Sequence, residues 1–193
     1  MPNFPRFRPR LAYPFRRYGR ALAIFTLLSA GISSSNPGFA QSVEYRVKAA
    51  FIFNFARFVE WPPSASNQHT PIDLAIWAPD EPYEVIAAAL ADKVVGKRKV
   101  RVGRFNPDGP MPHILFVHDA QEPIPQGLQR RLVAAHVLVV GQSTDFAAKY
   151  GIIGLVPRGD SLRFQINLHA AERSGLRLSG QLARLAEIVK DQP

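Results

Sequence analysis

The five histidines are the side chains best suited to acid–base or metal chemistry, and their spacing is the first test for an active site. No two of them stand at a helical ligand spacing, and His69 lies in a predicted loop. His113 and His118 bracket an apolar run, so a regular strand would place them on opposite faces. We expect strand-end histidines that bond backbone or water, rather than the alternative of a zinc site, and we expect no metal.

Other catalytic patterns are equally sparse. Gly151-Ile-Ile-Gly154 has too few glycines for a phosphate loop and leads into a predicted strand. The serines lack a G-x-S-x-G setting, and there is no cysteine nucleophile. We therefore expect no catalytic residues, no cofactor and no enzyme. A measurable hydrolase or transferase activity that is lost on changing His113 or His136 would support an enzyme instead.

The segment Gly141-Gln-Ser-Thr-Asp145 joins a predicted buried strand to a helix. Ligands gather beyond the carboxyl ends of strands in open α/β sheets, and free helix N–H groups attract anions. Gln142, Ser143 and Thr144 are therefore candidate ligand-binding residues. The simpler interpretation, which we favour, is that Ser143 or Thr144 caps the helix.

An aromatic stripe occupies the first predicted helix of the exported chain. Phe51, Phe55 and Phe58 recur at three- and four-residue spacing and lead to Trp61. Most of this stripe is expected in the core. An exposed remainder would mark a partner surface, because Trp and Arg dominate binding hot spots. The candidate partner-binding residues are Phe55, Arg57, Phe58 and Trp61.

Hydrophobic periodicity and turn residues give the elements that must position these side chains. Helices are predicted over residues 45–60, 81–91, 126–134, 169–174 and 180–190, with a short one inside 141–150. Strands are predicted over residues 72–78, 99–105, 114–117, 136–140, 152–156 and 162–168. Alternating strands and helices indicate one α/β domain. It has a mostly parallel central sheet, helices on both faces and a C-terminal antiparallel hairpin.

Residues 1–40 have the three parts of a secretory signal peptide. Six arginines precede the apolar run Ala21–Ile32, and Gly38-Phe-Ala40 supplies small residues for cleavage after Ala40. The run has 12 residues, whereas a bilayer-spanning helix needs about 20. We therefore expect a mature domain over residues 41–193 that has no membrane anchor and is exported from the cytoplasm.

If the signal is removed, the net charge of the mature chain is much smaller than that of the whole chain. The whole chain carries +9, from 24 basic and 15 acidic residues, but the signal holds six of the basic residues and no acid. The mature chain keeps 18 basic residues against 15 acids, a net charge of +3. An ordinary surface charge of this size gives no reason to expect nucleic acid as a partner.

Two ordered motifs at opposite ends of the mature chain give it a family resemblance. The first is Val47-Lys-Ala-Ala-Phe-Ile-Phe-Asn-Phe-Ala-Arg-Phe-Val-Glu-Trp-Pro62. The second includes Leu162-Arg-Phe-Gln-Ile-Asn-Leu168, Ala170-Ala171, Gly175-Leu176 and Leu178-Ser179. Because of these two motifs, the stretch from Tyr45 to Val189 resembles the YfiR family of exported regulators.

The resemblance implies a periplasmic, non-enzymatic protein. It would bind the periplasmic region of an inner-membrane diguanylate cyclase or sensor protein and hold it inactive, lowering cyclic-di-GMP signalling and biofilm formation. The resemblance also implies a homodimer. Some members control activity through disulfides, which this cysteine-free chain cannot form. The alternative function is a periplasmic small-ligand-binding accessory protein with its pocket beyond Gly141–Thr144.

Overall fold

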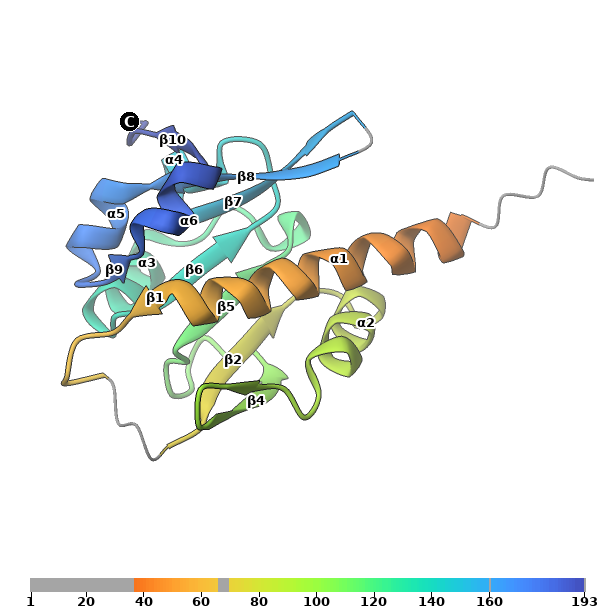
Figure 1. The fold of residues 1–193 in the computed structure, drawn as a ribbon, viewed down its shortest axis with the longest axis horizontal. Helices are drawn as coiled ribbons and strands as arrows, with labels where there is room; N and C mark the ends of the chain where they lie inside the picture. Colours follow the sequence, from red (N-terminus) through yellow and green to blue (C-terminus); the bar gives the residue numbers. More distant parts are fainter. Residues whose placement is uncertain (1–36, 66–69, 160, 193) are drawn as a thin grey trace, which may run out of the picture. The chain divides into compact units, whose positions relative to one another are not determined.

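The computed structural model describes residues 37–65, 70–159 and 161–192 (Figure 1). The signal-peptide prediction falls mainly on residues 1–36, which lie outside the described part, as does His69. The helices are α1 (Pro37–Phe58), α2 (Asp80–Leu90), the 3-10 turn η1 (Asp119–Gln121), α3 (Gln126–Ala134), α4 (Phe146–Lys149), α5 (Leu168–Arg173) and α6 (Gly180–Leu185).

Eight strands form one sheet, in the order β10-β8-β7-β6-β5-β2-β4-β3. Their bounds are β2 (Ile72–Trp77), β3 (Val94–Val95), β4 (Arg98–Arg104), β5 (Ile114–Val117), β6 (Leu138–Gly141), β7 (Ile153–Arg158), β8 (Ser161–Asn167) and β10 (Glu187–Val189). Strands β4, β2, β5, β6 and β7 run parallel, and β7 and β8 form an antiparallel hairpin. The predicted fold class is confirmed.

Two hydrophobic clusters lie on opposite faces of the sheet because strand side chains alternate. Ile72, Leu74 and Ile76 of β2 pack in the larger cluster with α1 and α2. Leu115 and Val117 of β5 belong to the smaller one, which α3 covers. Figure 1 shows α1 lying across the sheet, with α2 beside its N-terminal half.

The chain reverses its direction of travel through the sheet between β2 and β5. It moves outward from β2 to β4 and then returns to the other side of β2 to form β5 and β6. In open α/β folds such a switch point opens a crevice at the carboxyl ends of the flanking strands. The segments that follow β5 and β6 carry His118 and Gln142 to this edge.

In two of the predicted helices, the last residues form a strand instead. Helix α1 stops at Phe58, and Val59–Glu60 form strand β1, which pairs antiparallel with β9 (Arg177–Leu178). The predicted helix 180–190 was wrong beyond Leu185: Glu187–Val189 form β10, parallel to β8. Leu185, the last residue of α6, is 68% exposed. In both places, pairing with a distant strand overrides the local helical pattern.

Candidate binding surface and the carboxyl edge of the sheet

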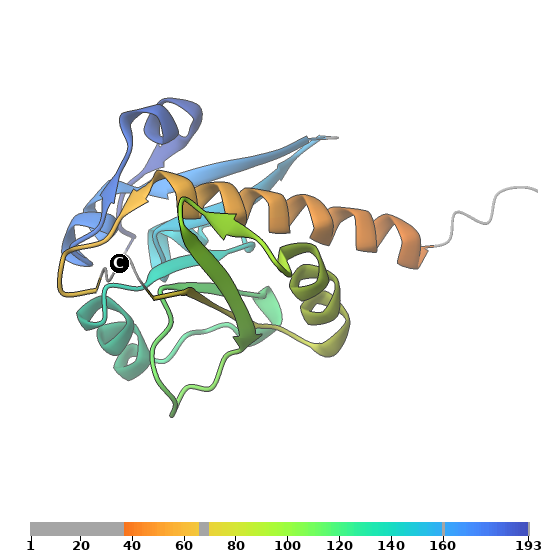
Figure 2. The same ribbon diagram turned by 60° about the horizontal axis from the view of Figure 1, so that its bottom comes forward.

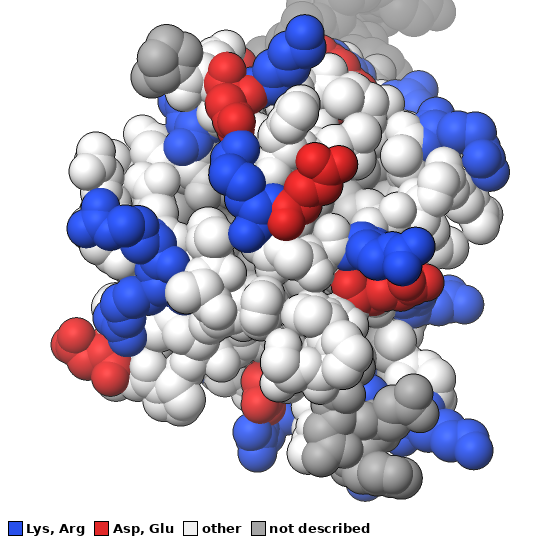
Figure 3. All heavy atoms as spheres, turned by 90° about the vertical axis from the view of Figure 1, so that its left-hand side faces the viewer, with Lys and Arg blue, Asp and Glu red and all other residues white. Residues whose placement is uncertain are grey.

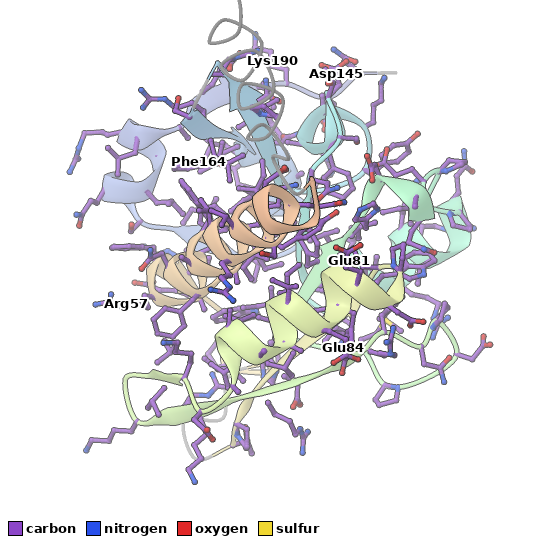
Figure 4. All side chains as sticks on the ribbon, turned by 90° about the vertical axis from the view of Figure 1, so that its right-hand side faces the viewer. Arg57, Glu81, Glu84, Asp145, Phe164 and Lys190 are labelled. Carbon is purple, nitrogen blue, oxygen red and sulfur yellow. The ribbon has the colours of Figure 1, made fainter. Side chains whose placement is uncertain are left out.

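The C-terminal end of α1 separates the four predicted partner-binding residues into two environments. Phe55 is only 1% exposed and packs against Phe164 of β8, with ring centroids 5.2 Å apart. It is a core residue. Arg57, in the last helical turn, is exposed, whereas Phe58 and Trp61 are half-buried. Figure 4 shows Phe164 beside α1 and Arg57 pointing outward from its far end.

The pairing of β1 with β9 fixes this end of the helix. The backbone N–H of Ser179 donates to the carbonyl of Phe58 at 2.9 Å, directly after β9. Glu60 stands opposite Arg177 in the strand pair, and their side chains approach to 3.9 Å. Helix α1 on one side and the strand pair on the other thus fix the backbone at Arg57, and Trp61 directly follows the strand pair.

Trp61 borders a hollow of about 350 Å³. Its ring meets the imidazole of His113 edge-on, with centroids 6.1 Å apart. Its indole N–H is buried and has no hydrogen-bond partner. The other residues that line the hollow are Ser64, Ala65, Met111, Pro112, His113, Ala134, Ala135 and His136. An incoming group that accepts a hydrogen bond would satisfy the indole.

Figure 3 looks at this end of the molecule, where charged side chains of both signs are scattered around broad uncharged areas. Such a mixture of apolar area and isolated charges is typical of protein-binding surfaces, which place aromatic and arginine side chains at their centre. The exposed Arg57 and the half-buried Phe58 and Trp61 supply residue types of this kind at the end of α1.

The carboxyl edge of the sheet holds a connected set of polar side chains. The ammonium group of Lys48, on α1, donates to Oε1 of Gln142 at 2.9 Å and pairs with Glu44 at 2.5 Å. Gln142 in turn donates from Nε2 to Asp119 at 3.1 Å. Lys48 is only 4% exposed, and a buried charge needs such partners to offset its lost hydration. Gln142 is therefore engaged inside the protein.

His118 belongs to the same set. Its Nε2 lies 3.1 Å from the hydroxyl oxygen of Tyr45, and its Nδ1 accepts from the backbone N–H of Ala120 at 3.1 Å. Burial lowers the pKa of His118, while Asp119, 2.6 Å from Nδ1, pulls the pKa upward less strongly. Burial also raises the pKa of Tyr45. Burial thus favours the neutral form of both side chains.

Ser143 and Thr144 do not cap α4, so that prediction was wrong. The capping position belongs to Asp145, which has a left-handed backbone (φ 63°) and no side-chain capping bond. The hydroxyl of Ser143 is buried without a partner, and Thr144 is exposed. A Cβ on Gly141 would lie 2.3 Å from the ring of Phe146, so the strand end and α4 approach too closely for a larger residue.

The histidines behave as expected from their positions at strand ends. The backbone N–H of Asp73 donates to Nδ1 of His113 at 3.1 Å, as that of Ala120 does to His118. Nδ1 of His136 lies 2.9 Å from the carbonyl oxygen of Ser174. Within the described ranges, no group of three or more His, Cys, Asp or Glu side chains could hold a metal ion.

Sequence reasoning missed Tyr45, Lys48 and Asp119 as members of the edge network. A signal was available for Lys48: it stands one turn before Ile52, on the helix face that also carries Tyr45 and Phe55. A lysine on an apolar face must find a partner or keep its charge in water. The identity of that partner, Gln142, depends on the fold and not on local spacing.

By its fold, the molecule is an α/β domain with a mostly parallel central sheet. At its polar edge Lys48, Gln142 and Asp119 bond one another, while Ser143 and Glu122 each keep a buried oxygen without a partner. Arg57, Phe58 and Trp61 lie at the end of α1. The chain belongs to the YfiR/HmsC-like family, whose sequence pattern matches residues 45–187. This family consists of periplasmic regulators that act with membrane proteins.

No curated protein matches the chain. None of the described helices is both long and apolar enough to span a bilayer.

Proposed function

We propose that this protein represses an inner-membrane diguanylate cyclase by binding its periplasmic region. The proposal rests on family membership together with the surface formed by Arg57, Phe58 and Trp61. Repression would lower cyclic-di-GMP and biofilm formation. The mature protein would begin at Gln41, after removal of residues 1–40, and act in the periplasm without an anchor of its own.

The mechanism is a shift in the partner's conformational population. A binding protein can hold a cyclase inactive only by preferring its inactive state. Moving an equilibrium from 99% active to 99% inactive requires about a 10⁴-fold preference. A rigid surface with a guanidinium and two aromatic side chains suits this task, because anchors of this kind concentrate binding energy in few contacts.

Co-purification tests the proposal. The mature chain, residues 41–193, is used as bait on detergent-solubilised inner membrane, and bound proteins are identified by mass spectrometry. We expect enrichment of a protein that carries a diguanylate cyclase domain. Arg57→Glu should reduce that enrichment at least tenfold. Arg130→Glu, at an exposed position on α3, provides a matched charge reversal and should leave the enrichment unchanged. Recovery of no cyclase, or equal recovery by both variants, contradicts the proposal.

We also propose a homodimer. Val43 and Val47, one turn apart on α1, are 44% and 41% exposed, and a second copy of the chain could cover them. Light scattering on the purified mature protein should give twice the chain mass. Val43→Asp combined with Val47→Asp should give the monomer mass. A monomeric wild type would refute this assembly.

A further inference from the structure

The outer face of β2 and β4 carries a groove that is lined by no helix within the described residues. The strands pair in parallel, with Asp73 opposite Arg101 and Ala75 opposite Gly103. These four residues share the face that α3 covers farther along, over β5 and β6. In Figure 2, β4 lies at the front, and the loop that follows it runs below the strand.

The groove has a volume of about 320 Å³ and a floor of very small side chains. Ala75 and Gly103 form the floor, and Pro110, Met111 and Pro112 form one wall. The loop that carries this wall is tied to α3, because Arg131 donates to the carbonyl of Pro107 at 2.7 Å. The groove therefore has a defined shape.

Gly103 has no conformational reason to be glycine. Its φ lies outside the left-handed region, and a Cβ placed on it would meet nothing within 4 Å. Glycine inside a strand weakens the strand, and it often marks a place where a ligand or another backbone approaches closely. The empty space above Gly103 is thus a feature that the fold does not require.

The two ends of the groove differ in character. At one end lies the ion pair of Asp73 and Arg101. Just beyond the residues that line the groove, and two residues before Arg101 on the same face of β4, Lys99 is exposed and has no ion-pair partner in the described chain. At the other end Trp77 and Phe105 pack together, with ring centroids 5.3 Å apart. The groove therefore joins an apolar floor to a net positive rim.

From this arrangement we infer that the groove docks an extended segment of a partner protein in which a large apolar side chain stands next to an acidic one. The apolar side chain fills the space over Ala75 and Gly103. The carboxylate lies toward Lys99 and Arg101, which gives the charge complementarity that selects the partner. This surface is separate from the arginine–aromatic end of α1, and the inference does not depend on the repression of a cyclase.

A peptide selection tests the inference. A random heptapeptide library is selected against the mature protein, and enriched peptides are synthesised. Their binding is followed through Trp77 in a Trp61→Phe background, where it is the one remaining tryptophan. We expect peptides that pair a large apolar residue with Asp or Glu and that change the emission of Trp77.

Three variants locate the binding. Gly103→Leu fills the groove and should weaken peptide binding at least tenfold without lowering the melting temperature. Lys99→Glu should weaken it about fivefold. Gly127→Leu, at an exposed glycine on α3 where an added Cβ would also meet nothing within 4 Å, should bind as the parent does. Failure to enrich any peptide, enrichment without acidic residues, or unchanged binding by Gly103→Leu would each overturn the inference.

Discussion

At the scale of single residues, the most consequential feature is the buried Lys48 and its acceptor Gln142. Gln142→Ala removes one acceptor from a buried ammonium group and should lower the free energy of unfolding by about 1–2 kcal/mol. Lys48→Met removes the charge itself. In the double variant, the loss of Gln142 should therefore cost about 1 kcal/mol less than it does alone. Urea unfolding of the four proteins checks this, and strictly additive effects would argue against the coupling.

His118 makes stability depend on pH. Because burial lowers the pKa of His118 in the folded protein, the unfolded chain takes up a proton first as the pH falls. Stability should thus be full above the ordinary histidine pKa and decline toward the lower, folded value, by at most about 1.4 kcal/mol per pH unit. His113, whose pKa burial also lowers, contributes in the same direction.

Urea unfolding between pH 7.5 and pH 5 measures this slope. His118→Gln should flatten the decline, although part of it remains because of His113. His169→Gln, at an exposed position, should keep the parental slope. If His118→Gln left the slope as steep as in the parent protein, the neutral state assigned to this side chain would be wrong.

At the scale of elements, Asn167 connects three segments. It is 1% exposed, and its Oδ1 accepts from the N–H of Ala170 at the start of α5. Its Nδ2 donates to the carbonyl of Ala147 at 2.9 Å and to Asp191 at 2.8 Å.

Asn167→Ala should therefore lower the free energy of unfolding by about 2–3 kcal/mol, since it removes a helix cap and leaves a buried carbonyl without its donor. Asn54→Ala, at an exposed position on α1, serves as the control and should change stability by less than about 0.5 kcal/mol. Thermal and urea unfolding compare the two. Equal stability of the two variants would show that the Asn167 contacts contribute little.

Sequence patterns predicted correctly those elements whose own residues carry a strong helical or strand signal. The bounds of α3 agree with the prediction, and β5 does so as well, because amphipathic spacing and a continuous apolar run are strong local signals. The short strands β1, β3 and β10 were missed, since each exists through pairing with a neighbour. The same limit applies to the sites: Arg57 and Trp61 could be selected by residue type, whereas the Lys48–Gln142 contact could not.

At the scale of the whole molecule, processing of the N-terminus decides where the protein works. If residues 1–40 are removed, intact-mass measurement of the periplasmic fraction should give a chain that begins at Gln41. Replacing Ala40 with Phe should block cleavage and leave the precursor with the membrane. A periplasmic form that begins elsewhere would correct the cleavage site, and a protein retained in the cytoplasm would exclude the proposed location.

The two proposed binding surfaces lie on different parts of the molecule. One is the end of α1, where Arg57, Phe58 and Trp61 are supported by the β1–β9 pair. The other is the groove over Gly103, on the opposite face of the sheet from α1 and α2. A protein with two independent docking surfaces can connect a membrane enzyme to a second protein, whose binding would adjust repression if the two sites are energetically coupled.

The most direct test of the central claim is the activity of the co-purified cyclase. Membranes that contain it are supplied with GTP, and cyclic-di-GMP is measured while the mature chain is added in increasing amounts. We expect a dose-dependent fall in synthesis, with at least tenfold more of Arg57→Glu needed for the same effect and no change in potency for Arg130→Glu. Synthesis that stays constant at saturating amounts of the mature chain would contradict the proposed repression.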